Sequence, residues 1–369
     1  MEIILLTEEN KAQWNEFCVK SADAWFWHTS GWMDYTLDYR PDLEPKQMSF
    51  FAKDNGQLIA VCPLTLEKYK DRLEFSFGGL SMPSPAFADG LLPKIQKNAQ
   101  NAVFGHVDAE AQRLGVKKVS FRGSPLAPGF LAHGMPPVNN LSKHGYLDKS
   151  FETQILELTP SIDELKSSAR KGHKYDINRS AKALDSAYVH GENADRNIFD
   201  QYCELHRKDA GIYTRPQSTY DAMYEFIRKG NAVLFGAKAK EGGQFIGFSY
   251  FIIYKNGIYY ASASKRNDLI EVPVAHFLLW EAVKFAKEKG LKYFELGWQF
   301  YEPSFQYNTT KKESAISEFK RGFGGEPVPQ MISEKYYDAE FFAKEYGERL
   351  ENYKNYLLAS KQVGEKENE

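Results

Sequence analysis

The chain has 369 residues, which at about 100–200 residues per domain predicts two domains or one large one. Hydrophobic residues make up 43% and charged residues 26%, as in ordinary soluble globular proteins, so a coiled coil, a collagen-like chain and a mostly disordered chain are excluded. The formal net charge is −2, whereas dedicated nucleic-acid binders are usually basic. A DNA-binding protein is therefore excluded, while a local basic patch for an RNA-linked substrate stays open.

The three cysteines (Cys18, Cys62 and Cys203) contain no C-x-x-C pair, which argues against a zinc site or a disulfide framework. The first residues lack the basic and apolar regions of a signal peptide, and no stretch approaches 18 apolar residues. The motifs of phosphate-binding loops, dinucleotide folds, zinc proteases and serine hydrolases are also absent. We therefore expect a cytoplasmic protein with no metal and no transmembrane segment.

Residues 1–150 have the pattern of a mixed α/β unit. Apolar, β-favouring segments flank Asp54-Asn55-Gly56, which is a strong hairpin signal. A segment with helical spacing and a further β-favouring segment, entered through Gly115, follow it. The expected order is a hairpin (47–66), a helix (95–114) and a strand (116–122).

Residues 151–330 repeat this order. Ser161 and Glu164 form a capping box, which predicts a helix that carries six basic residues and one acid between positions 166 and 182. Pro273 occupies the tolerated first position of a later helix, which stops at Gly290. The repeated elements are a hairpin (244–264), a helix (274–289) and a strand (291–296).

Antiparallel strands, then a helix, then another strand is the order of a GNAT-type N-acyltransferase core. Because both halves show it, the predicted fold class is α/β (α+β), with tandem GNAT-like domains that each hold a mixed, mostly antiparallel sheet flanked by helices. The expected boundaries are 1–150, 151–330 for the acyltransferase domain, and 331–369 for a C-terminal helical tail. In the tail, apolar side chains at helical spacing favour docking on the body, with partner binding as the alternative.

Three segments resemble the Fem family, the tandem-GNAT aminoacyltransferases that build peptidoglycan cross-bridges, and equally the broader set of Fem-like acyltransferases. They are residues 174–184, 257–298 and 316–326. The matching positions are Tyr259-Tyr260, Pro273, Trp280-Glu281, Ala286-Lys287 with Gly290, Tyr293 to Gly297, and Phe319-Lys320 with Gly322-Phe323-Gly324-Gly325.

The chain departs from the family in three places. Arg266 is the nearest candidate for an arginine that cross-bridge enzymes often carry shortly before the helix proline. The strand ends Leu296-Gly297-Trp298, where the family often has Gly-Gly, and a helical arm thought to engage tRNA has no counterpart. The missing arm and the net charge favour a donor other than tRNA.

The resemblance implies transfer of an acyl or aminoacyl group onto an amine, for example that of an amino sugar or peptide-stem envelope precursor. The donor would be an acyl-CoA or acyl carrier, or an aminoacyl-tRNA, with no tightly bound cofactor. The acceptor would be a small-molecule or nucleotide-linked amine. A non-catalytic binding or assembly protein on the same scaffold is the alternative, although a cationic, glycine-rich turn argues against lost chemistry. The sequence leaves the oligomeric state open.

Lys320 is the first catalytic candidate. Its ammonium is expected to be exposed in a glycine-rich turn, where it would hold a phosphate or stabilise developing negative charge. Arg321 and Gly322 of the same turn are candidate substrate-binding residues. Tyr301 and Tyr307 precede the turn and are candidate proton relays, with core packing as an equal alternative.

A second candidate surface is the basic helix. Arg170, Lys174 and Arg179 would anchor the phosphates of a nucleotide-linked acceptor or of an RNA-linked donor, and a solvated helix face is the alternative. Arg266 and Trp298 complete the candidate substrate-binding set. Glu295 and Glu302 are weaker candidates for the general base.

Overall fold

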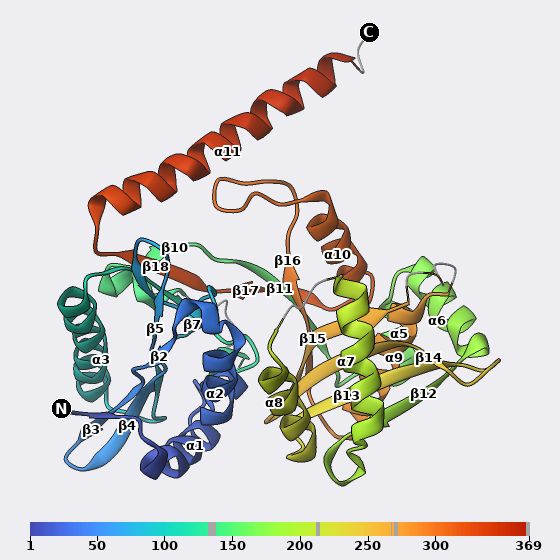
Figure 1. Ribbon diagram of the computed structural model, residues 1–369, viewed down its shortest axis with the longest axis horizontal. Coiled ribbons are helices and arrows are strands. Elements are labelled where there is room, and N and C mark those ends of the chain that lie inside the picture. Colours follow the sequence, from blue (N-terminus) through green and yellow to red (C-terminus); the bar gives the residue numbers. More distant parts are fainter. Residues whose placement is uncertain (132–137, 212–214, 267, 269–271, 367–369) are drawn as a thin grey trace.

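The structure is a computed structural model that describes residues 1–131, 138–211, 215–266, 268 and 272–366. Its two halves lie side by side, and the C-terminal helix leaves the body at the top of the view (Figure 1). Each half combines β-sheet with covering helices, so the predicted α/β class is confirmed.

The first half contains two sheets of strand order β1-β3-β4-β8 and β10-β18-β9-β6-β5-β2, with β7 also paired to β9. Helices α1, α2 and α3 are its main helices. The elements are β1 (Glu2–Leu5), α1 (Lys11–Lys20), a 3₁₀ turn (Phe26–His28), α2 (Ser30–Tyr39), β2 (Lys46–Gln47), β3 (Phe50–Asp54), β4 (Gln57–Cys62), β5 (Thr65–Lys68), β6 (Leu73–Phe75), β7 (Met82–Pro83), β8 (Ala86–Phe87), α3 (Pro93–Leu114), β9 (Val116–Arg122), α4 (Pro128–Leu131) and β10 (Leu147–Asp148).

The predicted elements of the first half are present. Strands β3 and β4 form the hairpin, and both turn residues, Asn55 and Gly56, adopt the left-handed conformation that a tight hairpin turn requires. Helix α3 ends at Gly115, which also has a positive φ, and β9 follows at once over the expected residues.

The second half is built on one seven-stranded sheet of order β12-β13-β14-β15-β16-β11-β17. The elements are β11 (Phe151–Glu157), α5 (Ile162–Ser168), α6 (Lys171–Ala183), β12 (Leu184–Val189), α7 (Arg196–Ala210), α8 (Gln217–Arg228), β13 (Ala232–Ala239), β14 (Phe245–Tyr254), β15 (Gly257–Lys265), α9 (Val274–Glu288), β16 (Tyr293–Gln299), α10 (Lys311–Arg321), β17 (Glu326–Gln330), β18 (Ile332–Tyr336) and α11 (Ala339–Lys366).

In the middle of this sheet, β15 and β16 run parallel but pair over only three residues. The last pair is Tyr259 with Glu295; beyond it β15 stays with β14 and β16 stays with β11. The two strands therefore separate, which leaves an opening in the sheet. The first half has the corresponding parallel pair, β6 with β9, and this supports the predicted repeat of one topology.

The basic segment differs from the prediction, because it forms two helices rather than one. The break falls at Ala169 and Arg170, where the Arg170 N–H donates to the Gly322 carbonyl at 2.8 Å. The ring of His173 then packs so closely on Gly322 that a Cβ there would lie 2.0 Å from it. The helix is therefore interrupted where it contacts the glycine-rich segment. That contact joins residues far apart in the sequence, so the local sequence does not show it.

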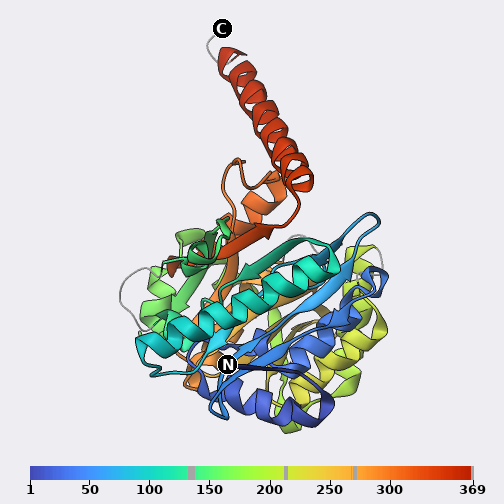
Figure 2. The same ribbon diagram turned by 90° about the vertical axis from the view of Figure 1, so that its left-hand side faces the viewer.

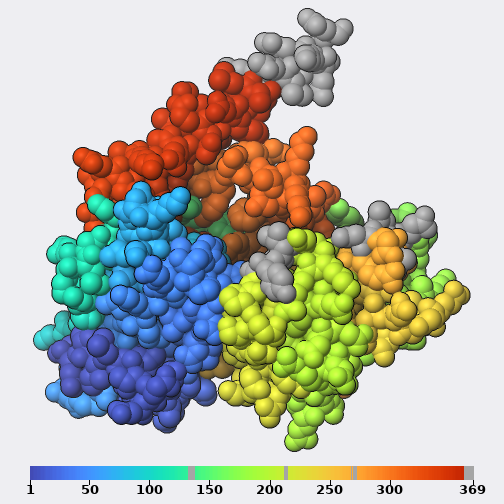
Figure 3. Space-filling model, viewed as in Figure 1, coloured from blue at the N-terminus to red at the C-terminus, as the bar shows by residue number. Residues whose placement is uncertain are grey.

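The two halves share one aromatic core. Trp25, Phe26 and Trp27 of the first half belong to the same buried cluster as Tyr202 and Tyr250 of the second. Figure 3 shows the corresponding outer surface, where the first half (blue) meets the segment of α7 and α8 (yellow-green) along a continuous seam. Residues from both halves can therefore line one site.

The C-terminal segment returns to the first half before it leaves the body. Strand β18 pairs with β9 and β10 in the second of the two sheets of the first half, so residues 332–336 form a strand within the segment expected as a helical tail. Helix α11 then projects outward (Figures 1 and 2). Within this helix Arg349 donates to Glu334 of β18 at 2.7 Å, whereas Leu350 and Leu357 are exposed. The boundaries 1–150, 151–330 and 331–369 stay a prediction.

Within the described residues, no helix is long and apolar enough to cross a membrane. The same residues contain no group of three or more His, Cys, Asp or Glu side chains that could hold a metal ion. Cys18, Cys62 and Cys203 are buried free thiols.

Candidate active site

Three neighbouring cavities meet where β15 and β16 separate, and Trp298 on β16 lines all of them. The first lies against α10 and includes Tyr260 and Lys320. The second lies between the two halves, and the third includes Tyr307 and the charged side chains around Glu334. A molecule in one cavity can thus approach a molecule in the next at the sheet opening.

Lys320 lies in the last turn of α10, so the prediction of an exposed lysine within the glycine-rich turn is wrong in detail. Gly322 caps the helix, and the left-handed glycines, Gly324 and Gly325, come later. The Lys320 side chain is half-buried and lines the first cavity. Burial lowers the pKa of its ammonium to about 8, and the nearby Glu295 carboxylate acts in the opposite direction.

Gly297 provides the space for this ammonium. It has φ of +99°, and a Cβ built on it would lie 2.8 Å from Lys320 Nζ. The register of β11 against β16 shifts here, so that Gln154 faces Gly297 and Ile155 faces Glu295. The irregularity turns the strand at the point where it leaves β15.

We predict that Gly297→Ala lowers the rate of acyl transfer at least 10-fold, because the new methyl group displaces the Lys320 ammonium. The positive φ adds a stability cost of about 1–2 kcal/mol. Gly290→Ala is the matched control, since Gly290 also has a positive φ but a Cβ there meets nothing within 4 Å. Melting temperatures and initial rates of both variants check this. Equal rates in the two variants would show that the space beside Gly297 is not needed.

Glu295 is buried on β16, with 2% of its surface exposed. Burial raises the pKa of its carboxyl to about 7, against a hydrogen bond from Thr153 Oγ1 at 2.7 Å and the charges of Arg122 and Lys320. Glu295 lines none of the three cavities. Its charge raises the pKa values of Lys320 and Arg122, which do line the cavities.

Arg122 comes from β9 of the first half and lines both the second and the third cavity. Its guanidinium lies 5.3 Å from the Trp27 ring centroid, within range of a cation–π contact. Burial lowers the pKa of Arg122, and its Nε has no hydrogen-bond partner among the described residues. Arg122 and Lys320 both act electrostatically on the one Glu295 carboxylate, so these three groups carry net positive charge when all are ionised.

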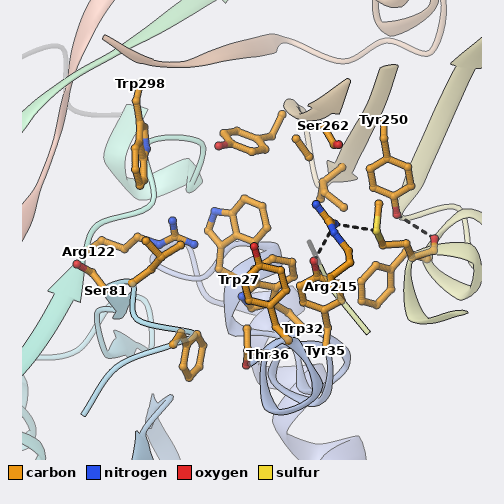
Figure 4. Close-up of a pocket in the computed structure, with 18 residues that line it drawn as sticks. Trp27, Trp32, Tyr35, Thr36, Ser81, Arg122, Arg215, Tyr250, Ser262 and Trp298 are labelled. Atoms are coloured by element: carbon orange, nitrogen blue, oxygen red, sulfur yellow. Dashed lines mark hydrogen bonds between the residues drawn. The ribbon is translucent and has the colours of Figure 1, made fainter. Parts of the chain in front are cut away.

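The second cavity is walled by aromatic side chains from both halves (Figure 4). Trp27, Trp32 and Tyr35 come from the first half, and Arg215 lies beside them, just before α8. Ala261 and Ser262 of β15 line both this cavity and that of Lys320. The two spaces therefore share a wall at the sheet opening.

Of the predicted site residues, the structure brings Lys320 and Trp298 together and places Tyr307 at the third cavity. The Tyr307 hydroxyl donates to the Lys149 carbonyl, and its pKa is raised by burial. Tyr301 is 46% exposed, and its hydroxyl donates to Glu152 at 2.5 Å. A catalytic role for either tyrosine stays a prediction.

The remaining candidates lie outside these three cavities. Arg321 donates to Gln299 at 3.1 Å, and Gly322 packs against His173. Arg266 pairs with Asp268 at the surface. The basic side chains lie on or next to α6: Arg170 pairs with Glu318, Lys174 donates to the Ser167 carbonyl, and Arg179 is exposed.

Sequence reasoning missed Arg122 and Arg215. Arg122 is the last residue of a strand in the half that resembles known families only in outline. Arg215 precedes Pro216 in a connecting segment with no recognisable motif. A strand ending in a charged residue was the available signal for Arg122; nothing local marks Arg215.

Comparison with known proteins agrees with this geometry. Residues 167–308 match the model of the family described as Acetyltransferase (GNAT) domain. Among solved structures, FemX superposes with a TM-score of 0.67 at 14% identity, covering 94% of this chain and 100% of that one. No curated protein sequence matches the chain.

Two further solved structures have the same fold. A C-terminal domain of a putative lysylphosphatidylglycerol synthetase from Agrobacterium fabrum has a TM-score of 0.57 at 14% identity, covering 88% of this chain and 92% of that one. A tandem GNAT protein from the clavulanic acid biosynthesis pathway has a TM-score of 0.53 at 12% identity, covering 91% and 98%.

Residues 167–308 therefore carry a GNAT acetyltransferase domain, and the chain as a whole has the fold of tandem GNAT structures. The likeness to FemX extends over both halves of the chain and is a likeness of fold, in agreement with the fold that the sequence resemblance implied.

Proposed function

We propose that the protein transfers an acyl or aminoacyl group to the amine of an acceptor, with the reaction at the opening between β15 and β16. The observation that carries the proposal is the Lys320 ammonium, which is half-buried beside Gly297 in a cavity lined by the separated strands. A preorganised cation of this kind stabilises the negative charge that develops on the carbonyl oxygen during acyl transfer.

The chemistry requires only a donor and an amine. The nitrogen lone pair attacks the carbonyl carbon, a C–N bond forms, and the carbonyl oxygen becomes an oxyanion beside Lys320. Collapse of this intermediate breaks the bond to the donor's sulfur or oxygen. The nitrogen loses one proton and the leaving group gains one, so atoms and charges balance. Net positive charge around Glu295 favours the anionic intermediate over the neutral reactants.

The donor is proposed to be an acyl-CoA or acyl carrier, or an aminoacyl-tRNA. The names of two similar structures bear on the transferred group, since one mentions a lysylphosphatidylglycerol synthetase, which is consistent with an aminoacyl group, and another mentions AcCoA. The acceptor is proposed to be a cell-envelope precursor with a free amine. A cytoplasmic location is part of this proposal, because these donors are made there.

A thermal-shift screen with acetyl-CoA, charged tRNA and an amino-sugar nucleotide tests the donor and acceptor classes. A ligand at about 100 times its dissociation constant stabilises the folded protein by about 2.7 kcal/mol, which is easily detected. Mass spectrometry of mixtures that contain a stabilising donor and an amine then identifies the acylated product. If no donor binds and no amide forms, the proposal fails.

We further predict that replacing Arg170, Lys174 and Arg179 together with alanine weakens binding of a phosphate-bearing donor and flattens its salt dependence. The physical reason is that fewer counterions are released when fewer cations contact phosphate. These residues lie outside the three cavities, so the Michaelis constant for a small acceptor should not change. Donor affinity measured from low to high salt checks this, and parallel salt curves for the two proteins would make α6 a solvated face.

A further inference from the structure

The second cavity has the composition of a site for a small, flat anion. Its volume is about 230 Å³, and its walls include indole, phenol and phenyl rings from both halves. For comparison, a cavity of about 150 Å³ accommodates benzene. The space therefore holds an aromatic or similarly compact apolar group together with a few further heavy atoms.

The lining of the cavity is also positively charged. None of the described residues that line it is acidic, whereas two of them, Arg122 and Arg215, are positively charged. The Nε atoms of both guanidinium groups are buried without a hydrogen-bond partner. Because an uncompensated buried charge is costly, such a lining favours a ligand that carries negative charge.

Arg215 is the better placed of the two for an anionic head group. Its Nη1 donates to the Tyr35 hydroxyl at 3.1 Å and to Met223 Sδ at 3.2 Å, and both acceptors are neutral. Burial raises the pKa of Tyr35 to about 12, so its phenol does not serve as a counterion at neutral pH. Arg122, by contrast, already interacts with the Glu295 carboxylate.

The head group is a carboxylate rather than a phosphate. The Arg215 guanidinium matches the single charge and the planar shape of a carboxylate. The charge of Arg122 is opposed by Glu295, so the cavity offers less positive charge than a phosphate dianion needs. The aromatic walls accommodate the apolar body and present ring faces to an ammonium. Ala261 and Ser262 line both this cavity and the Lys320 cavity, so a ligand in one lies next to a ligand in the other.

We infer that this cavity binds the acceptor as a compact apolar amino acid, whose carboxylate is held by Arg215 and whose amine faces the opening between β15 and β16. This inference rests on the proposed function, in which that amine is acylated. It names an acceptor whose carboxylate and amine both contact the protein, in place of the cell-envelope precursor considered above.

The test uses four probes with the full chain: L-phenylalanine, L-phenylalaninamide, phenyl phosphate and an amino-sugar nucleotide. Binding is measured by calorimetry to the natural protein and to Arg215→Gln and Arg228→Gln. Arg228 is the control because it is exposed on the neighbouring α8 and pairs with Glu225. We expect L-phenylalanine to bind at least 10-fold more tightly than its amide, and Arg215→Gln to abolish this preference while Arg228→Gln keeps it.

Equal affinity for acid and amide in the natural protein would overturn the inference, and so would tighter binding of phenyl phosphate or of the nucleotide. This comparison needs no variant, so it decides the question even if Arg215→Gln folds poorly. A preference for the acid that persists in folded Arg215→Gln also overturns it. Selective binding of L-phenylalanine with no acylated product under any donor would uphold the site and refute the proposed function. Acylation of other amines without selective binding of L-phenylalanine would uphold the proposed function and refute the site.

Discussion

Replacing Lys320 with alanine is expected to lower the rate of acyl transfer by about 100-fold or more, which corresponds to about 2.7 kcal/mol of transition-state stabilisation. The reason is that the half-buried ammonium faces the cavity at the strand opening. The melting temperature should change little. A cation whose pKa is lowered by burial is not a source of folding stability at neutral pH, so its loss offsets the lost packing.

Lys312→Ala is the matched control, since Lys312 is exposed near the start of the same helix. It should keep both the rate and the melting temperature. Lys320→Arg should restore the rate poorly, because a planar guanidinium does not replace a compact ammonium. An alanine variant that melts early but, where folded, transfers acyl groups normally would make Lys320 a structural residue.

The second large effect concerns pH. If the ammonium form of Lys320 is required, the rate should fall as pH rises through about 8, where this lysine loses its proton. The Glu295 carboxylate raises the pKa of Lys320, so Glu295→Gln should lower that pKa further and move the decline to lower pH. At neutral pH the variant should therefore be several-fold slower than the natural protein.

Rates measured from pH 6 to 10 in the natural protein, Glu295→Gln and Lys320→Arg distinguish this role from a merely structural one. In Lys320→Arg the alkaline decline assigned to residue 320 should be absent, because a guanidinium keeps its charge. A decline at the same pH in all three proteins would assign it to the acceptor, the donor or another group, and Glu295 would have no effect through Lys320.

The order of elements could be predicted because it depends on local signals. The turn at Asn55-Gly56, the stop at Gly115 and the proline that precedes α9 each act within a few residues, and they lie where the sequence predicted them. The division of the basic helix at Arg170 could not be predicted, because its cause is a hydrogen bond to Gly322, far away in the sequence.

In the candidate site, too, residues marked by a local pattern could be predicted and those that depend on distant contacts could not. Lys320 and Trp298 were found because a family resemblance marks their segments. Arg122 and Arg215 could not be recognised as site residues from the sequence, because each lines the shared cavity from a different half and the two halves must pack together to form it. Tertiary contact also decides the environment of Lys320: its lowered pKa comes from burial against strands that the sequence alone does not place beside α10.

A crystal structure of the protein with the donor found in the thermal-shift screen tests the central claim most directly. The account predicts that the donor's acyl carbonyl lies in the opening between β15 and β16, with its oxygen within hydrogen-bond distance of Lys320 Nζ. A donor whose acyl group lies outside this opening, with Lys320 out of contact, would contradict it.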